Sequence, residues 1–283
     1  MKNKIILSLL TVFFLLFSGC ALDTEESPLI QAVDDFSYDE AYQITDADLQ
    51  TENIEAEYID LTKQRAITWI KDAGTYVLSG NYEGQICIDA QDERVHLILN
   101  GVNIQSYDGP ALYVKSASKV ILTLAEQTEN VCMDSTDYSD YKDSEACIFS
   151  TSDLTINGSG TMYVYGYYKD ALRSRDVIKV LDGNLFIQSK SDGIHGNDGI
   201  VLMPETLSIE SEGKCLYTTK NGKREKGFID ICGGKTSLIS GEYAISSAAD
   251  VSIRTCTVSC KSVIADIFCE ENQYIEEGCL QHE

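Results

Sequence analysis

The chain has little proline, few basic side chains and almost no helical periodicity. Its 283 residues include three prolines, one tryptophan and three histidines, and 22 lysines and arginines stand against 45 acidic residues. The resulting formal charge of −23 disfavours nucleic acid and anionic lipid headgroups as partners. It also opposes an acidic polysaccharide unless a cation bridges the two. No second long apolar run follows the N-terminal one, so no other segment is expected to cross a bilayer.

The N-terminus has the pattern of an export signal. Lys2 and Lys4 lead into the uncharged run 5–17, whose 13 residues are too few for the ~20 of a membrane-spanning helix. This predicts a signal peptide over residues 1–19. Phe17-Ser18-Gly19-Cys20 then resembles the lipobox of bacterial lipoproteins, in which the cysteine is lipidated. We therefore expect a lipoprotein held on the outer face of a membrane through Cys20, with an ordinary secretory signal and a free Cys20 as the alternative.

The composition changes along the chain and divides it into four parts. After the signal peptide, residues 20–60 are acidic and weakly patterned, which predicts a spacer. We assign 61–268 to one folded domain and 269–283 to a C-terminal tail. The nine cysteines beyond Cys20 cannot all pair, none forms a CxxC motif and only three histidines accompany them, which argues against a zinc site.

Short strand-like alternations separated by glycine, asparagine and aspartate fill the folded part. They recur with a longer period, because the aliphatic residues at 148, 172, 194, 216 and 245 stand 24, 22, 22 and 29 residues apart. A period of this length without helices predicts an all-β solenoid, a right-handed single-stranded parallel β-helix with coils of about 22 residues. A β-sandwich is the alternative, but it does not predict a constant period. Trp69 alternates with Ile67, and we expect it in the core, capping the first coil.

From about residue 66 to residue 268 the chain resembles the clostridial carbohydrate-binding family of secreted right-handed parallel β-helices. The segments that carry this resemblance are ordered along the chain: Ala73-Gly74-Thr75-Tyr76-Val77-Leu78-Ser79-Gly80, Leu97-Ile98-Leu99-Asn100-Gly101-Val102-Asn103-Ile104, Leu154-Thr155-Ile156-Asn157-Gly158-Ser159-Gly160-Thr161 and Ser191-Asp192-Gly193-Ile194-His195-Gly196-Asn197-Asp198. The resemblance implies binding of polygalacturonate (pectin) or cellulose without cleavage, with calcium between coils.

The calcium sites of that family use the aspartates of a pattern close to Asp-Gly-Ile-x-x-x-Asp. Two segments match it, one from Asp170 to Asp176 and one from Asp192 to Asp198, and Asn197 offers a further oxygen. In register, the carboxylates of successive coils would lie about 5 Å apart and repel each other unless a cation lies between them. The alternative is that these aspartates are turn residues paired with nearby basic side chains. Lys214, one coil later, could replace a metal bridge from Asp192.

Two groups of side chains are candidates for saccharide binding. Tyr163, Tyr165 and Phe186 should point outward on neighbouring strands and form an aromatic platform, unless a loop covers them. Lys169, Arg173, Arg175 and Lys179 could hold a uronate carboxylate. The acidic segment 129–145 lacks the residue order of an EF-hand and is expected to be a solvated insertion.

The function expected from these features is non-catalytic polysaccharide binding at the cell surface. A calcium-dependent polysaccharide lyase, with Arg173 or Lys169 as base, is the first alternative, although fold analogy is weak support for activity. A surface adhesion or structural module without a saccharide ligand is the second.

Overall fold

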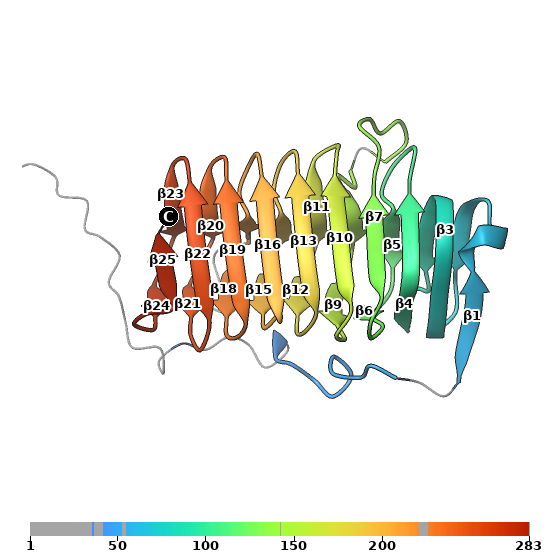
Figure 1. Ribbon diagram of the computed structural model, residues 1–283, viewed down its shortest axis with the longest axis horizontal. Helices are drawn as coiled ribbons and strands as arrows, with labels where there is room; N and C mark the ends of the chain where they lie inside the picture. Colours follow the sequence, from blue (N-terminus) through green and yellow to red (C-terminus); the bar gives the residue numbers. More distant parts are fainter. Residues whose placement is uncertain (1–35, 37–41, 53–54, 142, 221–225, 283) are drawn as a thin grey trace, which may run out of the picture.

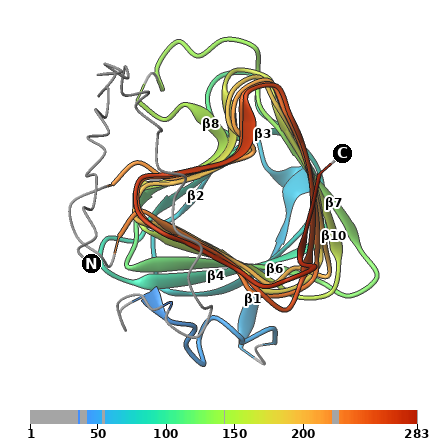
Figure 2. The ribbon, with the colours of Figure 1, turned by 90° about the vertical axis from the view of Figure 1, so that its left-hand side faces the viewer.

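The chain forms a rod-shaped parallel β-helix of about 10 coils (Figure 1). The computed structural model describes residue 36 and residues 42–52, 55–141, 143–220 and 226–282. Viewed along its axis, the rod has a three-sided outline (Figure 2). The all-β, parallel β-helix prediction is confirmed.

Each coil contributes one strand to each of three parallel ladders, here called the first, second and third sheets. The first sheet consists of β1 (Ala56–Asp60), the starts of β3 (Gly74–Asp89) and β4 (Arg94–Gln105), β6 (Lys119–Leu124), β9 (Asp153–Asn157), β12 (Val177–Val180), β15 (Gly199–Leu202), β18 (Phe228–Ile231), β21 (Val251–Ile253) and β24 (Gln273–Ile275). The second sheet consists of later parts of β3 and β4, β7 (Glu129–Met133), β10 (Thr161–Gly166), β13 (Asn184–Ser189), β16 (Thr206–Ser211), β19 (Lys235–Ser240), β22 (Thr257–Ser262) and β25 (Leu280–His282). The third sheet consists of β2 (Ala66–Ile70), the end of β3, β5 (Leu112–Ser116), β8 (Ala146–Ser150), β11 (Asp170–Ser174), β14 (Ile194–Gly196), β17 (Leu216–Tyr217), β20 (Tyr243–Ser247) and β23 (Ala265–Cys269).

The predicted register of the coils is confirmed in the third sheet. Leu172 pairs with Ile148 on one side and with Ile194 on the other, and the ladder continues through Leu216 to Ile245. All five side chains are fully buried. A single coil cannot enclose its own inner face, so each aliphatic side chain is covered by the equivalent residue of the next coil.

The β-helix extends beyond both expected boundaries. β1 lies within the range assigned to the spacer, yet it pairs with β3 residue by residue. At the other end, β24 and β25 add to β21 and β22, in the range assigned to the tail. Tyr274 and Cys279 are buried there. The terminal strands are short and polar, and only the coil beside them supplies the ladder that they extend.

Residues 42–52 also belong to the folded structure and lie along the first sheet (Figure 1). Tyr42 contacts Phe228 of β18, with 6.1 Å between ring centroids. Further along, the carboxylate of Asp48 is fully buried and accepts hydrogen bonds from Lys119 (2.8 Å) and Thr155 (2.6 Å). We call residues 42–52 the strap. It runs from the later coils towards the first one, opposite to the direction in which the coils progress.

Trp69 does not cap the core, and the prediction for it is wrong. Thr68 and Ile70 of β2 are the buried positions, while 46% of the Trp69 side chain is exposed. Tyr82 is the buried aromatic residue beside β2, and its hydroxyl accepts a 3.0 Å hydrogen bond from Thr68. The alternation was recognised, but its phase was assigned the wrong way round.

The acidic insertion after β7 is also less solvated than predicted. Asp134 and Tyr138 are almost completely buried, and the Tyr138 hydroxyl donates to Asp134 at 2.6 Å. The Tyr138 ring stacks on Tyr168, with 4.3 Å between centroids. Tyrosines at the positions between the acidic residues fasten the insertion to the rod.

Cys20 and the expected signal peptide lie outside the described residues. Within the described part of the chain, no helix has both the length and the apolar character needed to cross a membrane.

Candidate functional site

The expected aromatic platform forms on the outer face of the second sheet. Tyr163 of β10 pairs in register with Phe186 of β13, and their rings stack with 5.2 Å between centroids and 19° between planes. Phe186 is 37% exposed and Tyr163 is half-buried. Strand alternation buries Met162 and Val164 on either side of Tyr163, and it buries Leu185 and Ile187 on either side of Phe186. Both rings therefore point outward, as predicted.

A second aromatic pair continues the platform towards the end of the strand. Tyr165 stacks on Tyr167 with 5.9 Å between centroids and 14° between planes. Tyr167 is exposed and was not among the predicted site residues. Tyr165 and Tyr167 are two positions apart, so an unbroken strand would turn both side chains outward. Because β10 ends before Tyr167, the alternation did not predict the direction of that side chain.

Tyr167 also borders a groove of about 580 Å³ that continues across β13, β16 and β19. Most of the residues that line the groove carry polar side chains, and its one lysine stands against two glutamates. Lys190 pairs with Glu212, and Gln188 donates to Glu210 at 3.2 Å. Aromatic rings and polar side chains therefore lie side by side on one elongated face.

The buried carboxylate of Asp134 holds the turn that carries Tyr167. The Tyr167 backbone N–H donates to Asp134 Oδ1 at 2.6 Å, while Tyr138 donates to Oδ2. Burial raises the pKa of Asp134 to about 6, although these hydrogen bonds oppose the shift. The insertion thus contributes directly to the position of the second aromatic pair.

The predicted basic residues do not join the aromatic platform. Lys169 directly precedes β11 of the third sheet, and Arg173 lies within that strand. Both side chains face Glu145, which is 2.6 Å from Lys169 and 3.9 Å from Arg173. Arg175 lies over the ring of Phe149 at 5.6 Å. Lys179 is buried on the first sheet, where it contacts Asp48 at 3.2 Å. Since these cations already have acidic or aromatic partners on other faces, they form no common uronate site with Tyr163.

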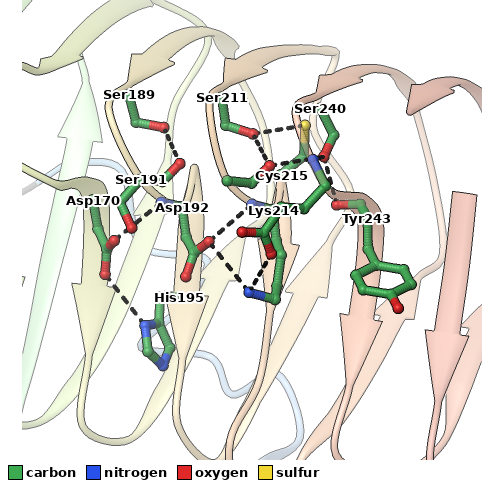
Figure 3. Close-up of polar contacts among 12 residues, drawn as sticks. Asp170, Ser189, Ser191, Asp192, His195, Ser211, Lys214, Cys215, Ser240 and Tyr243 are labelled. Carbon is green, nitrogen blue, oxygen red and sulfur yellow. Dashed lines mark hydrogen bonds and ion pairs between the residues drawn. The ribbon is translucent and has the colours of Figure 1, made fainter. Parts of the chain in front are cut away.

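Asp170 and Asp192, here called the upper pair of predicted metal ligands, are brought together in the third sheet, as the register predicted (Figure 3). Asp170 and Asp192 are both buried, and Asp170 Oδ1 accepts a hydrogen bond from the Asp192 backbone N–H at 3.1 Å. His195 joins them, with its Nδ1 3.2 Å from Asp170 Oδ2. One ligand atom from each of the three residues lies within 4.8 Å of the other two. Sequence reasoning missed His195 as a member of this cluster.

Lys214 lies beside Asp192, as predicted, but its ammonium group also pairs with Glu242. Its Nζ is 4.0 Å from Asp192 Oδ1 and 2.9 Å from Glu242, while its backbone N–H donates to Asp192 at 2.8 Å. Burial and the charge of Asp170 nevertheless raise the pKa of Asp192. Lys214 therefore compensates the two carboxylates only in part.

The other two predicted aspartates, Asp176 and Asp198, are here called the lower pair. Lysine side chains of the chain itself lie beside them. Lys220 and Lys226 contact Asp198 at 2.7 and 2.5 Å, and Tyr42 of the strap donates to it at 3.3 Å. Burial opposes ionisation of Asp198, but these two lysines lower its pKa overall. Asn197 does not face this pair as a free ligand, because its Oδ1 accepts a hydrogen bond from Thr219.

These contacts decide how well calcium fits. Calcium takes six to eight oxygen ligands. At the lower pair, two ammonium groups occupy the position that a cation would need, so the residues there do not fit it. At the upper pair, the third converging group is an imidazole nitrogen rather than an oxygen. The set of ligands therefore departs from that expected of a calcium site.

Comparison with known proteins agrees with the fold. A curated protein from Acetivibrio thermocellus, named a carbohydrate-binding domain-containing protein, is 29% identical over 217 residues, covering 75% of this chain and 76% of its own. A solved structure, described as the polysaccharide lyase-like protein from C. thermocellum in a gadolinium derivative, superposes with a TM-score of 0.74 at 27% identity. That match covers 80% of this chain and 98% of the other. The family model of carbohydrate-binding domain-containing proteins matches residues 64–272, and the chain belongs to this family.

Proposed function

We propose that this protein binds a polysaccharide on the outer face of the second sheet without cleaving it. The observation that carries the proposal is the stacked pair of Tyr163 and Phe186, which continues into Tyr165 and Tyr167 and then into the polar groove. The C–H faces of pyranose rings pack on aromatic rings, and polar groups beside them accept and donate hydrogen bonds to hydroxyls. Both elements are present here in a row along the rod.

Of the two expected ligand classes, this face favours a neutral cellulose-type chain over polygalacturonate. Lys190, the cationic residue of the groove, is paired with Glu212. The chain as a whole carries a charge of −23, which repels a polyanion. A neutral glucan avoids this repulsion and needs no bridging cation, so its binding should persist in EDTA.

Membrane attachment through a lipid on Cys20 completes the proposal. The lipobox-like Phe17-Ser18-Gly19-Cys20 supports it, as does the hydrophobic run before it. A lipid anchor with more than one acyl chain holds firmly, because each buried methylene contributes about 0.8 kcal/mol. The rod would then hold a polysaccharide at the cell surface.

Lyase activity is the second candidate, because the structural neighbour is described as polysaccharide lyase-like. The groups that could act as base argue against it here. Arg173 faces both Glu145 and Asp170, and Lys169 is paired with Glu145 at 2.6 Å. A base must be free to take a proton from the substrate, and both groups are held by carboxylates instead.

The experiment that tests the function is a binding assay on insoluble cellulose and on cello-oligosaccharides, with polygalacturonate in parallel, each with and without EDTA. We expect binding to cellulose in both conditions. Absorbance of unsaturated products in the polygalacturonate samples would establish a lyase instead. Absence of binding to every glycan of a broad array would favour the adhesion or structural alternative.

A further inference from the structure

Asp170, Asp192 and His195 form a buried cluster of metal-binding side chains at the junction of β11 and β14 (Figure 3). In the part of the chain that the structure describes, no other group of three such side chains converges as closely. Each of the three is at most 8% exposed. The register that pairs Leu172 with Ile194 places the two aspartates on adjacent coils, and His195 then follows Ile194 on the outward side of the same strand.

With a neutral imidazole at His195, the cluster and its charged neighbours carry a net negative charge. Two of its cationic neighbours, Arg173 and Lys214, are shared with a carboxylate outside the cluster, and a third, Lys169, is paired only with Glu145 in the described part of the chain. The charged side chains of the cluster and its surroundings are the cations of Lys169, Arg173 and Lys214 and the carboxylates of Asp170, Asp192, Glu145 and Glu242. Four carboxylates thus face three cations. The lower pair differs, because Asp176 and Asp198 face two lysines, Lys220 and Lys226.

The imidazole is the second sign of a ligand. His195 is 4% exposed, and its Nε2 has no hydrogen-bond partner among the described residues. Its Nδ1 is the atom that converges with the carboxylates. Two buried acids beside an imidazole nitrogen are poorly compensated by the protein alone. A cation bound between Nδ1 and the two carboxylates would compensate both acids and would leave the ring proton on Nε2.

The donor set identifies the class of cation. Calcium is bound by oxygen atoms, whereas an imidazole nitrogen suits zinc, cobalt, nickel, copper and iron. Two carboxylates and one imidazole make three protein ligands and leave a position for water. We propose that Asp170, Asp192 and His195 bind one divalent first-row transition metal ion in preference to calcium. This inference does not depend on polysaccharide binding, since the cluster lies on a different sheet from the aromatic platform.

The test uses Co²⁺ and Ca²⁺ as probes on the full chain after removal of metals with EDTA and dialysis. We expect Co²⁺ to bind with a stoichiometry of one, to raise the melting temperature, and to give a visible spectrum without the ultraviolet thiolate band. Calcium at the same concentration should shift the melting temperature less. The cysteines should not compete, because burial raises the pKa of Cys132 and Cys215, for example, to about 12.

Two matched variants sharpen the test. His195→Asn should weaken Co²⁺ binding by about tenfold or more while leaving any calcium binding unchanged. Asp176→Asn, at the lysine-compensated pair, should leave Co²⁺ affinity as in the wild type. The proposal is overturned if calcium binds the wild type as tightly as Co²⁺, if no Co²⁺ binds, or if the spectrum shows thiolate ligation. All three outcomes are measured on the wild type, so they hold even if His195→Asn does not fold.

Discussion

Tyr163 and Phe186, from successive coils, stack with their ring planes 19° apart and their centroids separated by 5.2 Å. The stacking follows from the parallel register, which places equivalent outward positions of neighbouring coils side by side. It produces a flat aromatic surface on a rigid rod, with its rings arranged before any ligand arrives. Such preorganisation lowers the entropy cost of binding.

Removing one ring of the platform should weaken glycan binding without unfolding the rod. Phe186→Ala deletes the more exposed ring of the pair. We expect about a 5- to 30-fold loss of affinity for cello-oligosaccharides, corresponding to about 1–2 kcal/mol. Isothermal titration calorimetry measures it. Trp69→Ala, which removes an exposed aromatic ring from the third sheet, is the matched control, and an equal loss in that variant would contradict the platform.

The strap should depend on Asp48. This fully buried carboxylate accepts hydrogen bonds from Lys119 and Thr155, and its removal would leave the buried Lys179 ammonium without its carboxylate. We expect Asp48→Ala to cost about 3–5 kcal/mol of stability, the usual effect of breaking a buried ion pair. Denaturant titration measures the loss. Asp46→Ala removes the same charge from an exposed position of the strap and should be nearly neutral.

Acid should also loosen the strap. Burial opposes ionisation of Asp48, but hydrogen bonds from Lys119, Thr155 and Thr45 hold its pKa well below the usual range. A lowered pKa in the folded state means that this contribution is complete above the unfolded value of about 4 and is lost as the pH falls further. Protease cleavage within the strap should therefore accelerate below pH 4 in the wild type. Equal cleavage rates at pH 3 and pH 7 would exclude this account.

Asp134 should give the opposite dependence on pH. Its folded pKa of about 6 lies above the unfolded value, so the native state retains this proton between about pH 4 and pH 6 while the unfolded state releases it. Stability from this group is then highest below pH 4 and falls by about 3 kcal/mol as the pH rises through 6. Asp134→Asn should abolish this part of the pH dependence. The test is the difference between the unfolding free energies of wild type and variant across that range, and a constant difference would contradict it.

Lipidation should depend on Cys20. Cys20→Ser should release the protein from the membrane fraction of its host, because a serine cannot form the thioether that carries the lipid. Mass spectrometry of the wild-type N-terminal peptide should show an acylated cysteine. An unmodified Cys20 in a protein that is nonetheless exported would indicate an ordinary secretory signal instead.

The sequence by itself determined the solenoid, its register and the outward direction of Tyr163, Tyr165 and Phe186. These follow from a strand period of two and a coil period of about 22 residues, both of which are local and repetitive. The ends of the rod escaped this logic. Trp69 was assigned the wrong phase because no equivalent earlier coil existed for comparison, and the terminal strands β1, β24 and β25 fell in the ranges assigned to the spacer and the tail.

The tertiary structure decided everything that depends on side chains from different coils and on segments outside the repeat. The sequence indicated Asp170 and Asp192, but only the fold showed that His195 joins them and that lysines from a later segment occupy the lower pair. From the sequence, Asp48 is one of several acidic residues in the predicted spacer. Only the fold brings Lys119 and Lys179 into contact with it. Periodicity predicts which residues share a ladder, but charge compensation depends on long side chains reaching across it, and their partners can be identified only in three dimensions.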